Sequence, residues 1–158
     1  MKSRSNRDIY KEDLTFLLKL KASIGRLHNR IHDNLALIAI EDLGERHRGV
    51  DFQYTTAGAA GIDITGVNRS GVTTVVAEVK TTLPDVKGTI RGPQKAAIKK
   101  DLERLKAHAT ATNRYLIVLS PTTKLAILKQ LKTAVEYPTV TIFNALPEKY
   151  SETDQIDE

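Results

Sequence analysis

The sequence predicts an α/β fold in which helices pack against a mixed β-sheet. Apolar residues recur at threes and fours over residues 8–47, which is the period of an amphipathic helix. After Gly49 the period changes to short apolar runs separated by turn residues, which is typical of strands. Two later helical patterns then alternate with apolar runs, and this alternation predicts strand-helix-strand units.

The N-terminal helical segment spans about residues 8–47. Its apolar stripe consists of Leu14, Leu17, Leu18, Ile24, Leu27, Ile31, Leu35, Ile38 and Leu43. Asn34 is a candidate point of division into two helices, and Gly49 is a plausible stop. The stripe has two open interpretations, since it can pack on the sheet or form a dimer interface.

Three strands are expected next, over residues 50–56, 61–67 and 73–80. The sequence NRSG between the last two is a polar turn, so these strands form a hairpin. If NRSG is a four-residue loop, Val67 pairs with Val72 and Asp63 lies opposite Val76. The three strands then form an antiparallel meander.

The second half of the chain continues with helix, strand, helix and strand. Pro93 suits the first position of a helix over residues 93–109, and Ser120 with Pro121 begins a helix over residues 121–134. The continuous apolar run at 114–120 predicts a buried strand that joins the sheet in parallel, and residues 140–144 form a last short strand.

Length and charge limit the class of protein. The 158 residues suit one domain over residues 1–150, followed by a flexible acidic tail over residues 151–158. The net charge is +5, and the tail holds four acids and no base, so removing it leaves +9 on residues 1–150. This basic body favours a polyanionic partner.

No apolar run is long enough to span a bilayer, and no cysteine is present, so we expect a cytoplasmic protein without thiolate metal sites.

Acidic and basic side chains gather on one face of the predicted hairpin. In that register Asp63, Glu78 and Lys80 project to the same side, while the other face is apolar. Two close carboxylates repel each other, and a divalent cation removes that penalty. Mg²⁺ prefers carboxylate oxygens and water, and a lysine beside it can orient the attacking water or neutralise charge on a phosphate. The pattern predicts phosphodiester hydrolysis.

The sequences GID and AEVK, which contain Asp63, Glu78 and Lys80, resemble the PD-(D/E)XK nuclease superfamily. The resemblance implies a restriction endonuclease-like core with the order α-β-β-β-α-β and an extra N-terminal helical segment. It assigns Asp63 and Glu78 to Mg²⁺, with Mn²⁺ as an expected substitute, and Lys80 to the attacking water. Ile62 departs from the pattern, because many members have proline there.

The resemblance also implies two further site residues. Members often carry a glutamate on the helix before the first strand, and here Glu41 is preferred over Glu45 because it lies among apolar residues. Many carry a glutamine or lysine at the start of the second helix. Gln94 occupies that place and is expected to face the sheet, near the metal water or a phosphate oxygen.

The predicted function is that of a Mg²⁺-dependent DNA endonuclease of restriction type. A Holliday junction resolvase or a DNA-repair nuclease is the close alternative, and a non-catalytic DNA-binding protein on the same scaffold is a further one. The expected partner is duplex or branched DNA, with no membrane, and a homodimer would present two active sites to two strands. Lys87, Arg91 and Lys95 are the candidate phosphate contacts.

Overall fold

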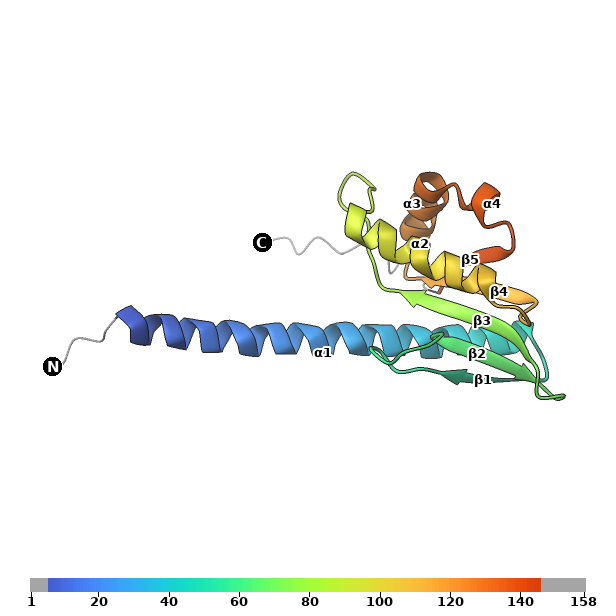
Figure 1. Ribbon diagram of the computed structural model, residues 1–158, viewed down its shortest axis with the longest axis horizontal. Coiled ribbons are helices and arrows are strands. Elements are labelled where there is room, and N and C mark those ends of the chain that lie inside the picture. The colour runs from blue at the N-terminus through green and yellow to red at the C-terminus, as the bar shows by residue number, and fades with distance from the viewer. Residues whose placement is uncertain (1–5, 146–158) are drawn as a thin grey trace.

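A computed structural model describes the backbone of residues 6–145 and the side chains of residues 14–145. The tail predicted over residues 151–158 lies outside this range. The elements follow the predicted order along the chain, except that the single helix expected over residues 121–134 is divided at Lys132, whose backbone is left-handed (φ 47°), into two helices (Figure 1). They are α1 (Asn6–Arg46), β1 (Val50–Tyr54), β2 (Ile64–Asn68), β3 (Thr73–Lys80), α2 (Gly92–Ala107), β4 (Asn113–Val118), α3 (Pro121–Leu131), α4 (Thr133–Glu136) and β5 (Val140–Asn144).

The five strands form one mixed sheet in the order β1-β2-β3-β4-β5. Antiparallel pairing joins β1 to β2 and β2 to β3, as the predicted meander requires. Parallel pairing joins β3 to β4 and β4 to β5, with α2 in the first connection and α3 and α4 in the second. The α/β class and the mixed sheet with flanking helices are therefore confirmed.

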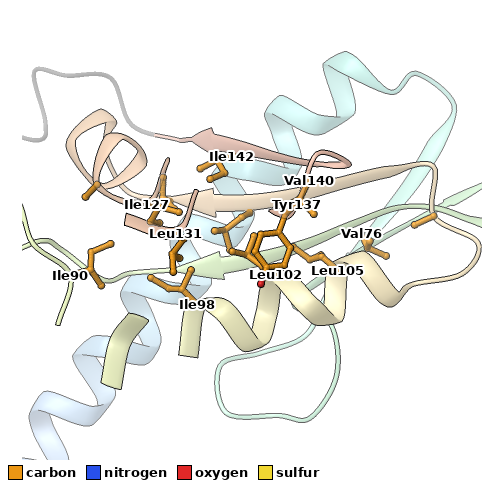
Figure 2. Packing of buried hydrophobic residues seen from close by; sticks show 14 residues of the cluster. Val76, Ile90, Ile98, Leu102, Leu105, Ile127, Leu131, Tyr137, Val140 and Ile142 are labelled. Atoms are coloured by element: carbon orange, nitrogen blue, oxygen red, sulfur yellow. The ribbon is translucent and has the colours of Figure 1, made fainter. Parts of the chain in front are cut away.

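Both faces of the sheet are covered by helices. On one face Leu35 and Leu43 of α1 pack against Ile64, Ala77 and Ile117 of the strands. On the other face α2 and α3, together with Tyr137 directly after α4, close a second apolar cluster with β3, β4 and β5 (Figure 2). Val76 of β3 therefore points into one core, whereas Ala77 and Val79 point into the other.

The first helix runs without interruption through Asn34, so the expected division into two helices is wrong. Asn34 is exposed, and a solvated side chain at this position gives the helix no reason to end. Figure 1 shows that α1 continues far beyond the sheet towards its N-terminus. Among the described residues, no helix is long and apolar enough to cross a membrane.

The predicted hairpin register is also wrong, because the ladder shifts between Gly66 and Val67. Val67 pairs with Thr73, and Ile64 pairs with Ala77. Gly66 is required at this point, because a Cβ there would lie 2.7 Å from carbon atoms of both Val50 and Phe52. Such irregularities insert extra residues into one strand and depend on local packing.

Candidate active site

Asp63, directly before β2, and Glu78, near the end of β3, lie opposite each other at the end of the hairpin away from its turn. The observed register, continued by one residue from Ile64 and Ala77, puts Asp63 opposite Glu78 instead of opposite Val76. This is a displacement of two residues from the predicted pairing, and an even displacement leaves each side chain on its original face. The Val79 N–H donates to Asp63 Oδ2 at 2.7 Å, which fixes the aspartate against the end of β3.

The two carboxyl groups have opposite pKa shifts. Burial and the negative charge of Asp63 raise the pKa of Glu78 to about 8, although Arg104 acts in the other direction. Burial alone would raise the pKa of Asp63, but hydrogen bonds from His32, the Val79 N–H and Glu78 together lower it. A hydrogen bond joins the pair, and near neutral pH its proton resides on Glu78.

Two residues of α2, Asp101 and Arg104, contact the side chains of Lys80 and Glu78. Lys80 Nζ lies 2.6 Å from Asp101 Oδ2, and Arg104 donates from Nη1 to Glu78 Oε1 at 2.7 Å. Asp101 is buried, whereas the Arg104 side chain is 40% exposed and also donates to the Gly61 carbonyl. Glu78 and Lys80 of β3 therefore each contact a charged side chain of α2, Arg104 and Asp101 respectively.

A histidine from α1 completes the cluster from the other side. His32 Nε2 lies 3.4 Å from Asp63 Oδ2, and its Nδ1 lies 3.6 Å from Asp33 Oδ1. The hydrogen bond to Asp63 raises the pKa of His32, since it outweighs the opposite effect of burial. The protonated form of His32 is thus favoured beside Asp63, and it stabilises the ionised form of that carboxylate.

These groups line an open pocket with a volume of about 480 Å³. Asp63, Glu78 and Lys80 lie in it together, as the sequence predicted. Gln94 also lines it, but its side chain is exposed instead of turned against the sheet. The pocket is accessible to a ligand as large as a phosphate group.

The glutamate expected from the first helix is not in this pocket. Glu41 and Glu45 are both exposed and neither lines it. His32 is the α1 residue that reaches Asp63, and nine residues of helix put Glu41 roughly 13 Å further along the axis. The preference for Glu41 is therefore corrected: its apolar neighbours pack on the sheet while its own side chain points to solvent.

The predicted DNA-contacting residues lie outside the acidic cluster. Lys87 and Arg91 are exposed in the segment between β3 and α2. Lys95 lines a different pocket, of about 400 Å³, beside Lys99 and Lys132. Only a ligand that extends beyond the acidic pocket could contact all three of these basic side chains.

Sequence reasoning missed His32, Asp101 and Arg104 as members of the cluster. A signal existed for Asp101, because it falls between Ile98 and Leu105 on the buried face of α2, where an unpaired acid is costly. His32 similarly lies on the same helix face as Leu35 and the residues that pack on the sheet. Nothing in the spacing identified their partners, which come from distant strands.

The donor set suits Mg²⁺ better than a metal that needs a full protein cage. Among the described residues, no three histidine, aspartate or glutamate side chains are arranged to hold a metal ion. Mg²⁺ is usually bound by one or two carboxylates and several waters, which Asp63 and Glu78 can provide. Burial first, and then the negative charges of Asp63 and Asp101, raise the pKa of Glu78, and a bound cation would offset both effects. The residues present therefore fit the ion.

A comparison of the chain with known protein families finds no matching family, and a comparison with curated proteins finds no similar sequence.

Proposed function

We propose that this protein is a Mg²⁺-dependent DNA endonuclease with a restriction endonuclease-like core of the PD-(D/E)XK type. The observation that carries the proposal is the convergence of Asp63, Glu78 and Lys80 on one open pocket. Two carboxylates that share a proton are suited to exchange it for a divalent cation. The basic net charge of +5 supports a polyanionic substrate.

Each residue then has a role in hydrolysis. Asp63 and Glu78 would hold Mg²⁺, or Mn²⁺ in its place, and such an ion would supply Lewis-acid chemistry for hydrolysis. Lys80 would orient the attacking water, and Asp101 would position the ammonium group of Lys80. Gln94 would donate to a phosphate oxygen from the rim of the pocket.

Basic residues around the pocket would bind the DNA backbone. Lys87 and Arg91 are exposed and lie on the chain segment that follows β3, so they are the first candidates. Lys95 could contact a phosphate further along the strand. Contacts of this kind neutralise phosphates and make binding decrease steeply as salt increases.

The choice between restriction cleavage and cleavage of branched DNA depends on the substrate. We favour a restriction-type activity, with a Holliday junction resolvase or repair nuclease as the alternative. A restriction enzyme cuts linear duplex at one short sequence, whereas a resolvase cuts four-way junctions and leaves plain duplex intact. Incubation with Mg²⁺ and long duplex, four-way junction or flap DNA distinguishes these activities.

The test of the proposed site uses three variants and one control. Asp63→Ala and Glu78→Ala should abolish Mg²⁺-dependent cleavage, and Lys80→Ala should reduce cleavage more than it reduces Mg²⁺ binding. Glu45→Ala, which removes an exposed acid outside the pocket, should cleave like the parent protein. Cleavage by Asp63→Ala at the parental rate would refute the assignment.

A second candidate is a non-catalytic DNA-binding protein on the same scaffold. The contacts of Lys80 with Asp101 and of Glu78 with Arg104 favour it, because they already engage both β3 side chains with groups of the protein itself. This candidate predicts salt-sensitive DNA binding with no cleavage of any of the three substrates. It also predicts that Mg²⁺ leaves the stability of the protein unchanged.

A further inference from the structure

The N-terminal part of α1 exposes a row of large apolar side chains. Leu17, Leu20, Ile24 and Leu27 are between 46% and 58% exposed. Figure 1 shows that this part of α1 extends away from the sheet and the other helices. Four large apolar side chains in a row on a free helix are costly in water, so the row needs a partner.

The spacing of the row identifies the kind of partner. Leu17, Leu20, Ile24, Leu27 and Ile31 alternate steps of three and four, which is the heptad repeat of a coiled coil. Asn34 and Ile38 continue the same steps, so the seam extends over three heptads. The a positions are leucine followed by three isoleucines, and the first two d positions are leucines. β-Branched residues at a with leucine at d favour two parallel strands.

The seam and the sheet use different sides of α1. Leu35, Ala36, Ala39 and Leu43 are buried against the sheet. At 100° per residue, these four lie roughly 120° around the helix axis from the C-terminal part of the seam. Ile38 is still 37% exposed, although α1 is already packed on the sheet at that level. A partner helix can therefore lie along the seam without displacing the sheet.

Charges flanking the seam are compatible with two identical helices in register. In a parallel pair, each g residue faces the e residue of the partner that lies five positions further along the chain. In the exposed part of the helix these pairs are Phe16 with Lys21 and Ser23 with His28, whereas Leu35, the e residue that would face Arg30, is buried against the sheet. Neither exposed pair brings like charges together, so these flanking positions do not oppose self-association.

We propose that a second copy of this chain covers the seam, with the two α1 helices parallel and in register as a two-stranded coiled coil. The dimer would then hold two copies of the sheet domain on the outer sides of the coiled coil. His32, which faces the pocket, lies outside the seam, so both pockets would remain open. The proposal does not depend on nuclease activity.

Single cysteines provide a direct test, because the natural chain contains none. Leu20→Cys and Leu27→Cys each put a thiol at a d position, where equivalent residues of a parallel pair face each other. Both should form a disulfide-linked dimer under mild oxidation. Asn29→Cys, on the exposed outer side of the helix, should not. Crosslinking of only one d variant indicates antiparallel helices and overturns the proposal, as does crosslinking of neither.

The mass in solution provides an independent readout. Sedimentation equilibrium should give twice the chain mass of 17.5 kDa for the parent protein and for Asn29→Glu. The double variant Leu20→Glu with Leu27→Glu should be monomeric, with the unfolding transition of the sheet domain retained because both side chains lie outside its core. A monomeric or trimeric parent protein, or a dimer that survives both glutamates, contradicts the proposal.

Discussion

Glu78→Gln should stabilise the protein at alkaline pH. The glutamate is only 1% exposed, and burial together with the charge of Asp63 raises its pKa to about 8. A glutamine has the same shape as the protonated acid. Its amide can donate to Asp63 while its carbonyl accepts the hydrogen bond from Arg104, so the substitution retains the contacts and removes the titration.

The sign of the pH dependence follows from the raised pKa. The folded state binds the proton of Glu78 more tightly than the unfolded state does, so stability falls as pH rises from about 4.5 to about 8. At 1.36 kcal/mol per pH unit, this interval corresponds to a ceiling of about 5 kcal/mol. The ionisation of Glu78 is coupled to the charges of Asp63 and Arg104, which reduces its effect. We therefore expect the free energy of unfolding to change by an amount on the order of 2–4 kcal/mol over this pH interval.

Urea unfolding at about pH 5 and about pH 8.5 measures this difference. The stability gained by Glu78→Gln should be small at the lower pH and several-fold larger at the higher one. Glu45→Gln, which changes an exposed acid on α1, controls for the loss of a charge and should show no such growth. Saturating Mg²⁺ at pH 8.5 should stabilise the parent protein and not Glu78→Gln. Parallel pH profiles of the parent and Glu78→Gln would refute the reasoning.

Three further changes test neighbouring parts of the account. Gly66→Ala should lower the free energy of unfolding in urea by about 1–3 kcal/mol, because its methyl group would overlap two side chains of β1; unchanged stability would contradict the close packing. Arg104→Gln should bind Mg²⁺ more tightly by calorimetry, since the guanidinium no longer competes for Glu78; weaker binding would contradict that competition. His32→Gln should lose most stability below about pH 6.5 and progressively less above the raised pKa of His32, because the protonated histidine stabilises Asp63; a loss independent of pH would contradict this.

The sequence predicted the order of the elements because periodicity reports local structure. It also predicted that Asp63 and Glu78 share a face, since the pairing observed beside them differs from the predicted one by two residues, and an even displacement keeps each side chain on its face. The exact pairing was wrong because the shift at Gly66 arises from packing against β1, which hairpin spacing does not encode.

The residues that surround the carboxylates were harder to predict. Asp101 and Arg104 act through contacts with β3 residues more than twenty positions away in the chain. His32 lies on α1, 31 positions before Asp63 in the chain, yet the two side chains are neighbours in space. Glu41 was preferred for its apolar neighbours, but in a helix the adjacent positions point in different directions. Side-chain direction on α1 therefore decided which residue reaches the pocket.

The most direct test of the central claim is anomalous diffraction from crystals of the protein soaked with Mn²⁺. We expect a Mn²⁺ peak bonded to oxygens of both Asp63 and Glu78, and its loss in Asp63→Asn crystals. Saturating Mn²⁺ with no peak between these two carboxylates, or with a peak only at other residues, would contradict the proposed metal site.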